Sequence, residues 1–174
     1  GAGRMKRAAY LLAALVFVVD QLVKYWVLNG IRLPDVEGGT IPLLPFLSLT
    51  YVQNRGVSMG MLTAGSDIER WSLVALTGLI AVVVAFWIRR ERKWPESIAL
   101  GLVLGGALGN IVDRIRFGYV VDFVHLHAGP WSFYVFNVAD AAISIGVAIL
   151  LVRALASKSD SGRSDGKRDR LHDA

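Results

Sequence analysis

Four aspartates lie in or beside the long apolar runs of this sequence, at positions 20, 113, 122 and 140. Asp140 falls within residues 134–152, a stretch otherwise apolar enough to cross a membrane. An ionisable group near the bilayer centre costs ~2.5–3.5 kcal/mol on insertion scales and usually marks a functional site. Several acids kept near membrane spans indicate chemistry or ion movement.

Two aspartates that share a site could carry out acid–base chemistry. They cannot both ionise easily, so one keeps a proton while the other stays charged. Such a pair can activate a water and protonate a leaving amine, as aspartic peptidases do. Asp140 is one candidate by its depth, and Asp122 is its expected partner. Asp113 competes with Asp122, but its neighbour Arg114 favours a charged, structural carboxylate there.

Amide side chains accompany these acids at helical spacing. Asn137 precedes Asp140 by three residues, and Asn110 precedes Asp113 by three, so each pair would share a helix face. These amides could orient a carboxylate or hold a peptide carbonyl. Asn54, in the polar turn formed by residues 53–56, could grip a substrate backbone.

Asp20 and Lys24 are four residues apart in the first apolar run, with the acid N-terminal, which is the favourable orientation in a helix. They are expected to form a structural pair rather than to act in catalysis.

Composition places the chain among integral membrane proteins. Hydrophobic residues make up 54% of the 174 positions and charged residues only 19%, which is too apolar for an ordinary soluble domain. Cysteine is absent, so thiolate nucleophiles and cysteine-bound metals are excluded. The net charge of +5 does not indicate nucleic-acid binding, because the basic residues cluster where a membrane protein places them.

Four spans are predicted, at about residues 8–28, 71–88, 98–115 and 134–155, each close to the ~20 residues needed to cross. A cleavable signal peptide is the rival reading of the first span, which is disfavoured by its length and its charged residues. The short basic flanks lie on one side, which the positive-inside rule makes cytoplasmic. Both termini are then cytoplasmic, and the polar residues gather in the outer layer, with Asp140 roughly 9 Å below the outer end of its helix.

The outer segments 29–70 and 116–133 are expected to carry a small sheet. Residues 41–52 are rich in β-forming residues, and residues 118–127 are also extended in character, so the two could pair. Residues 5–156 are expected to form one membrane domain. Residues 157–174 are expected to be a disordered cytoplasmic tail, and residues 1–4, ahead of Met5, a cloning remnant.

Five blocks together resemble the bacterial lipoprotein signal peptidases, or signal peptidase II. They occur in family order between residues 20 and 143, which is highly specific. The blocks are Asp20-Gln21-x-x-Lys24, Gln53-Asn54-Arg55-Gly56, Gly105-Gly106-Ala107-Leu108-Gly109-Asn110-x-x-Asp113-Arg114, Val120-Val121-Asp122-Phe123 and Phe136-Asn137-Val138-Ala139-Asp140. One departure follows Gly56, where Val57-Ser58-Met59-Gly60 replaces the family's small and aromatic residues.

The resemblance implies an inner-membrane aspartyl endopeptidase that cuts prolipoproteins before a diacylglyceryl-modified cysteine. It implies an all-α membrane fold of four helices with a small extracytoplasmic sheet and a short outer helix. The catalytic acids would be Asp122 and Asp140. The substrate-binding residues would be Asn54, Asn110, Arg114 and Asn137, and the supporting polar residues Asp20, Lys24 and Asp113. We expect no cofactor and no metal, a monomer, and lipids and lipid-modified prolipoproteins as the partners.

Other readings remain open from the residues alone. A proton or ion carrier would spread its carboxylates across the membrane, whereas these gather on one side. An assembly factor would explain the spacing of Gly101, Gly105 and Gly109, which is typical of close helix packing. His125 and His127 could touch a metal but lack a third ligand. A serine–lysine peptidase would need Lys24 and a serine such as Ser58.

Overall fold

The computed structural model describes residues 1–56 and 67–172. Its main helices and strands follow in the order α1 (Ala2–Tyr25), β1 (Thr40–Leu44), β2 (Leu47–Asn54), α2 (Asp67–Arg90), α3 (Trp94–Phe117), β3 (Val120–Ala128), β4 (Trp131–Phe136) and α4 (Val138–His172). A π-helical turn, η1 (Trp26–Gly30), extends α1, and two 3-10 turns, η2 (Leu33–Asp35) and η3 (Glu37–Gly39), lead into β1.

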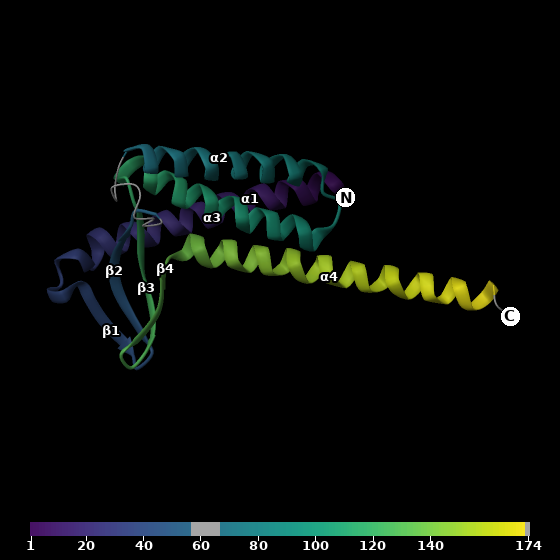
Figure 1. The fold of residues 1–174 in the computed structure, drawn as a ribbon. Helices are drawn as coiled ribbons and strands as arrows, with labels where there is room; N and C mark the ends of the chain where they lie inside the picture. Colours follow the sequence, from purple (N-terminus) through teal and green to yellow (C-terminus); the bar gives the residue numbers. More distant parts are fainter. Residues whose placement is uncertain (57–66, 173–174) are drawn as a thin grey trace.

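The four long helices run side by side, and the sheet projects from one end of the bundle (Figure 1). All four are long and apolar enough to cross a membrane. Three of the predicted spans lie inside α1 with η1, inside α2 and inside α3. The two ends of the bundle therefore differ, since in the described residues the sheet lies at one end alone.

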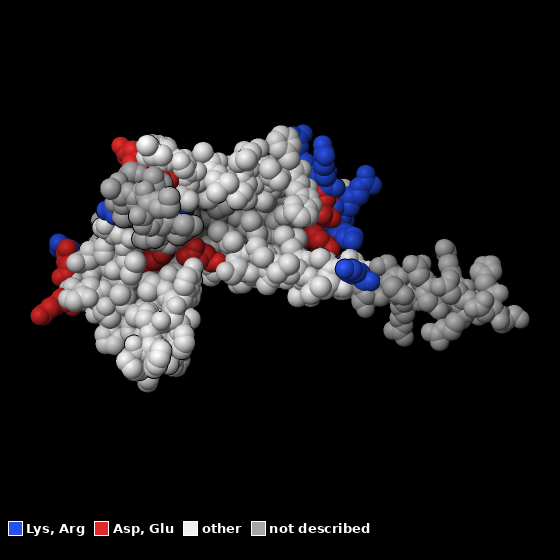
Figure 2. Space-filling view, viewed as in Figure 1, with Lys and Arg blue, Asp and Glu red and all other residues white. Residues whose placement is uncertain are grey.

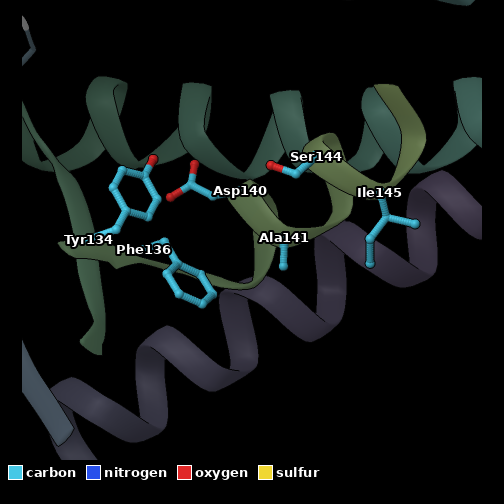
Figure 3. Close-up of a pocket in the computed structure, with 6 residues that line it drawn as sticks. All are labelled: Tyr134, Phe136, Asp140, Ala141, Ser144 and Ile145. Atoms are coloured by element: carbon cyan, nitrogen blue, oxygen red, sulfur yellow. The ribbon is translucent and has the colours of Figure 1, made fainter. Parts of the chain in front are cut away.

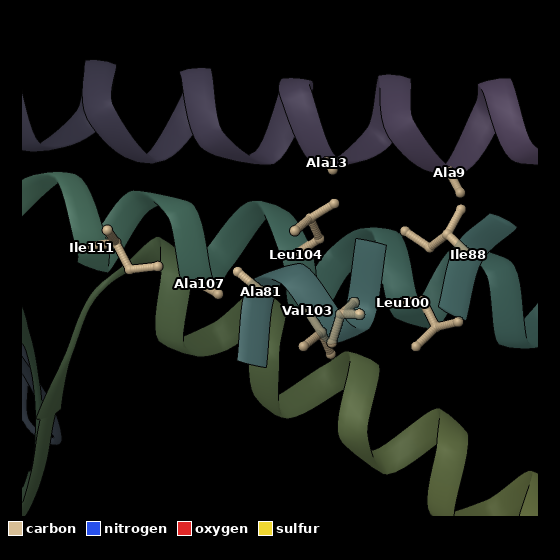
Figure 4. Packing of buried hydrophobic residues seen from close by; sticks show 10 residues of the cluster. Ala9, Ala13, Ala81, Ile88, Leu100, Val103, Leu104, Ala107 and Ile111 are labelled. Carbon is tan, nitrogen blue, oxygen red and sulfur yellow. The ribbon is translucent and has the colours of Figure 1, made fainter. Parts of the chain in front are cut away.

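Helix α3 is the core of the bundle and packs against the other three (Figure 4). Glycines on two of its faces allow this close approach. A Cβ added at Gly105 would lie 2.5 Å from the carbonyl oxygen of Ala13 in α1, and one at Gly106 would lie 2.5 Å from that of Ala139 in α4. The small-residue spacing seen in the sequence thus corresponds to real helix contacts, in which Leu100 and Ile88 are fully buried.

The sheet is antiparallel, with the strand order β1-β2-β3-β4. The predicted pairing of the two extended outer segments is confirmed, because Leu49 of β2 lies opposite Val124 of β3. The all-α description is too narrow, since β4 completes a four-stranded sheet. Within residues 29–56 the helical segments are the end of η1 and the short turns η2 and η3. Residues 57–60, where the family pattern breaks, lie outside the described residues.

The predicted fourth span begins too early. Residues 134–136 belong to strand β4, and helix α4 starts at Val138. The apolar side chains of β4 merge with those of the helix in the sequence, so hydropathy alone does not separate the two. At its other end α4 continues as a helix to His172, where the sequence predicts disorder from residue 157. Propagating an existing helix requires no new nucleus, which favours this continuation.

Candidate functional site

The site is built around the first turn of α4. Asn137 is the residue before the helix, and its Oδ1 accepts the backbone N–H of Asp140 at 2.9 Å. In return, the Asp140 carboxylate accepts the backbone N–H of Asn137 at 3.2 Å. This reciprocal arrangement is a capping box, formed here by asparagine and aspartate. Asp140 therefore lies in the first turn of α4, not about 9 Å along the helix as the sequence suggested.

Asp122 reaches the same place from strand β3. Its Oδ2 accepts the side-chain amide of Asn54 at 3.0 Å, and its Oδ1 accepts that of Asn137 at 2.8 Å. The carboxyl group is almost fully buried. This burial, followed by the nearby charge of Asp140, raises the pKa of Asp122 to about 6. Asp122 is therefore suited to hold a proton close to neutral pH.

Asn110 and Asn137 tie the two acids together. Asn110 donates its amide to Asp140 Oδ1 at 2.9 Å, and its own Oδ1 accepts the Asn137 amide at 3.1 Å. Asp122 and Asp140 are thus joined through one continuous chain of amide hydrogen bonds. Three predicted substrate-binding residues, Asn54, Asn110 and Asn137, each bind a catalytic candidate directly.

A buried ionic cluster lies behind these amides. Lys24 Nζ lies 2.8 Å from Asp20 Oδ2 and 2.9 Å from Asp113 Oδ2, and all three side chains are nearly inaccessible. The ammonium group also donates to Asn110 Oδ1 at 3.2 Å. The predicted pairing of Asp20 with Lys24 is confirmed. The partner of Asp113 is Lys24, not its sequence neighbour Arg114.

The cluster holds the surrounding backbone as well as side chains. Asp20 Oδ1 accepts the N–H of Ala139 in the first turn of α4 at 2.9 Å. Asp113 Oδ2 accepts the N–H of Val121 in β3 at 3.0 Å. The cluster thus fixes the residue before each of the two acids, Asp122 and Asp140, from the α1–α3 side.

Gln21 belongs to the polar network of the site, although the residue-by-residue reasoning missed it. Its amide donates to Asp113 Oδ1 at 3.0 Å and to Asp20 Oδ2 at 3.2 Å. The residue follows Asp20 in the first motif block, and that adjacency was the available signal. It bridges the two carboxylates that share Lys24.

Arg114 is the cation beside the acids. The charges of Asp122, Asp140 and Asp113 all attract its guanidinium. Its Nε is buried and has no hydrogen-bond partner within the described residues. A partly unsatisfied guanidinium next to two carboxylates is able to bind a carbonyl oxygen of a ligand.

A groove of about 290 Å³ opens from Asp140 along α4 (Figure 3). In this view the Asp140 carboxylate lies between the hydroxyls of Tyr134 and Ser144, while Phe136 points the other way. Its lining residues are Tyr134, Phe136, Asp140, Ala141, Ser144 and Ile145. The lining is mainly apolar, so the groove suits an apolar ligand that reaches the acid from the membrane.

A second hollow, of about 400 Å³, lies on the strand side of Asp122. Its lining residues are Val52, Gln53, Asn54, Arg55, Gly56, Asp122 and Val135. The polar turn that was expected to grip a backbone thus lies beside one acid, and the apolar groove beside the other. Acidic side chains are visible in the notch where the sheet meets the helices (Figure 2).

His125 and His127 lie on the sheet, away from the acids, and bind hydroxyl groups. Thr50 Oγ1 lies 3.0 Å from His125 Nδ1, and Ser48 Oγ lies 2.9 Å from His127 Nε2. A group of three potential metal ligands does not occur among residues 1–56 and 67–158.

The chain folds as a bundle of apolar helices, and two amide-bound aspartates lie where a small sheet meets these helices. These features define a polytopic membrane protein with a paired-carboxylate site. A family model described as signal peptidase (SPase) II matches residues 12–156. The chain belongs to this family and is therefore a peptidase. With its four apolar helices, it is a multi-pass bacterial membrane protein.

Relatives support this membership over nearly the whole length. The chain is 48% identical over 162 residues to a lipoprotein signal peptidase of Sphingopyxis alaskensis, covering 92% of each chain. It is 54% identical over 145 residues to one of Rhizorhabdus wittichii, covering 83% of each. A solved bacterial membrane enzyme matches with a TM-score of 0.73 and 28% identity over 88% of this chain and 90% of that one. The resemblance given by the five motif blocks is confirmed.

Proposed function

We propose that this chain is an aspartic endopeptidase that removes the signal peptides of diacylglyceryl-modified prolipoproteins, cutting before the lipidated cysteine. The observation that carries the proposal is the chain of amide hydrogen bonds joining Asp122 and Asp140. Neutral amides orient both carboxyl groups without neutralising either, which leaves both free for proton transfer. The relatives are lipoprotein signal peptidases, and this supplies the substrate class.

The two acids take different roles because their surroundings differ. Asp122 holds the proton, since burial and the Asp140 charge raise its pKa. Asp140 is the base, because it is more open, lining the groove, and its carboxylate accepts the side-chain amide of Asn110 and the backbone N–H of Asn137 just before α4. Asp140 takes a proton from a water as that water's oxygen attacks the scissile carbonyl carbon, while Asp122 gives its proton to the carbonyl oxygen.

Collapse of this intermediate restores the enzyme. The C–N bond breaks as the leaving amine takes the proton held by Asp140. Asp122 regains its proton from a hydroxyl group of the intermediate as the new carboxyl group forms. Arg114 binds a substrate carbonyl oxygen near the reacting bond, and the apolar groove along α4 receives substrate from the side, within the membrane.

The proposed orientation places the sheet outside the cell and both termini in the cytoplasm, in the bacterial inner membrane. Lysines and arginines gather at the bundle end opposite the sheet (Figure 2). Short basic flanks of membrane spans are typically cytoplasmic. The paired acids then face the outer leaflet, and we propose a monomer, because one chain holds both acids.

A gel-shift cleavage assay tests this function. Purified protein in detergent is given a diacylglyceryl-modified prolipoprotein and, separately, the unmodified precursor. We expect the lipidated substrate alone to be cut, and Asp122→Asn and Asp140→Asn each to abolish cutting while the protein stays folded. Asp35→Asn is the matched control, because that exposed carboxylate pairs only with Arg32 in the described residues. Near-normal turnover by either site variant would overturn the paired-acid assignment.

A further inference from the structure

The start of α2 contacts two segments that carry site residues, the turn after Asn54 and the end of α3, although α2 itself contributes no residue to the site. Gly56, at the end of the Asn54 turn, packs against this helix so closely that an added Cβ would lie 2.6 Å from Leu73 Cδ1. On its other side the first turn of α2 reaches the end of α3. The residue that makes this second contact is Arg70, which lies outside every motif block in the sequence.

Arg70 binds two backbone carbonyls at the end of α3. Its Nε donates to the oxygen of Arg114 at 2.7 Å, and its Nη2 donates to that of Ile115 at 2.6 Å. The last carbonyls of a helix lack partners within the helix and carry its partial negative charge. A guanidinium that binds two of these carbonyls gives them hydrogen-bond partners and places a positive charge at the negative end of the helix, through short, charge-assisted hydrogen bonds.

This contact bears directly on the cation of the site. The carbonyl that Arg70 binds belongs to Arg114, whose guanidinium lies beside Asp122 and Asp140 and whose Nε has no partner among the described residues. The same carbonyl accepts the N–H of Gly118, which ends the helix in a left-handed conformation. The Arg114 side chain makes no hydrogen bond within the described residues that would orient it, so its position depends on the backbone that carries it.

We propose that Arg70 is a positioning residue for cleavage, which fixes the end of α3 and thereby holds Arg114 beside the two aspartates. The proposal rests on the proposed function, because it assigns Arg70 a role in that reaction. Arg70 does not touch the acids, so it acts on substrate only through Arg114. Its neighbour Trp71 limits the movement of the guanidinium, whose Cζ lies 4.9 Å from the indole ring centroid.

Kinetics of Arg70→Ala and Arg70→Lys test this role, with Arg116→Ala as the matched control. Arg116 lies on the same helix end and is exposed, and its Cζ lies 4.9 Å from the ring centroid of Phe117. We expect Arg70→Ala to lower kcat/KM by about tenfold to a hundredfold, mainly through KM, as for other misplaced binding groups. Arg70→Lys should recover part of the loss, and Arg116→Ala should match the unsubstituted protein.

Two further readouts separate positioning from general stability. A displaced cation would raise the pKa of Asp122, so the alkaline limb of the pH profile should move to higher pH in Arg70→Ala. The double variant Arg70→Ala/Arg114→Ala should be no slower than Arg114→Ala, because both changes remove one effect. Additive losses, or an unchanged pH profile, would overturn the proposal.

Hydrogen exchange gives a readout that does not need activity. Exchange at the Gly118 amide should speed up in Arg70→Ala and stay unchanged in Arg116→Ala, since only Arg70 holds the carbonyl that this amide binds. Unchanged exchange would show that Arg70 does not fix the end of α3. If the unsubstituted protein itself cuts nothing, the proposed function fails and Arg70 has no reaction to position.

Discussion

The four aspartates divide into two pairs by the residues that bind them. Asp20 and Asp113 share the ammonium group of Lys24, which holds both carboxylates in place. Asp122 and Asp140 bind amides and backbone N–H groups, which orient a carboxyl group but leave its proton exchangeable. This difference in partners supports the proposed division of the four acids into a structural pair and a pair that transfers protons.

The proton on Asp122 predicts the pH dependence of cleavage. Burial and the Asp140 charge raise its pKa to about 6, so the group loses its proton as the pH rises through that value. The mechanism uses that proton, and kcat/KM should therefore fall as the pH rises above about 6. The apparent pKa of this alkaline limb describes Asp122 and Asp140 together, because the two acids interact. Single-turnover cleavage between pH 4.5 and 8.5 measures it, and a rate that climbs steadily to pH 8 would contradict the assignment.

Lys24 should matter for folding more than for catalysis. Lys24→Met keeps the length of the side chain but leaves Asp20 and Asp113 buried without a cation, which typically costs about 3–5 kcal/mol. Thermal unfolding in detergent should show a marked fall in Tm. Lys93→Met is the control, since that side chain is exposed and makes no ion pair within the described ranges. Equal Tm values for the two variants would show that the buried cluster adds little stability.

At the scale of the elements, the sequence predicted the helices better than the join between β4 and α4. Asp20 and Lys24 could be paired from spacing alone, because four residues make one helical turn. Strand β4 could not be separated by hydropathy, since Phe133 and Val135 are as apolar as the helix that follows. The capping box of Asn137 and Asp140 was the signal that the helix starts at Val138. The hydrogen bonds among the amides depend on tertiary contacts that spacing does not encode.

The glycines of α3 predict a packing effect that depends on position. Gly105→Ala would place a methyl group 2.5 Å from the Ala13 carbonyl oxygen and 2.7 Å from Val16 Cβ. Overpacking of this kind costs about 1–3 kcal/mol, so the variant should unfold at a lower temperature. Gly78→Ala in α2 is the matched control, because an added Cβ there meets nothing within 4 Å. That variant should be neutral or gain roughly 0.5–1 kcal/mol, as expected for alanine in a helix. A loss as large as that of Gly105→Ala would mean that helix contacts do not set the difference.

At the scale of the whole molecule, the two ends of the helix bundle differ in the residues and elements that they carry. One end carries the sheet, the paired acids and the two hollows beside them. The other carries most of the lysines and arginines of the described residues. A substrate anchored in the bilayer would meet the acids only from the leaflet on the sheet side, so the orientation of the chain decides which substrates it can reach.

The absence of cysteine from the sequence makes this orientation directly measurable. Glu37→Cys places one thiol at the sheet end, and Arg92→Cys places one in the connection between α2 and α3, both at exposed positions. In intact spheroplasts, a membrane-impermeant maleimide should label Glu37→Cys at once and Arg92→Cys only after the membrane is permeabilised. Cleavage of a lipidated substrate by both variants confirms that each is folded. The reverse labelling pattern would place the acids on the cytoplasmic side, where a precursor already exported across the membrane could not reach them.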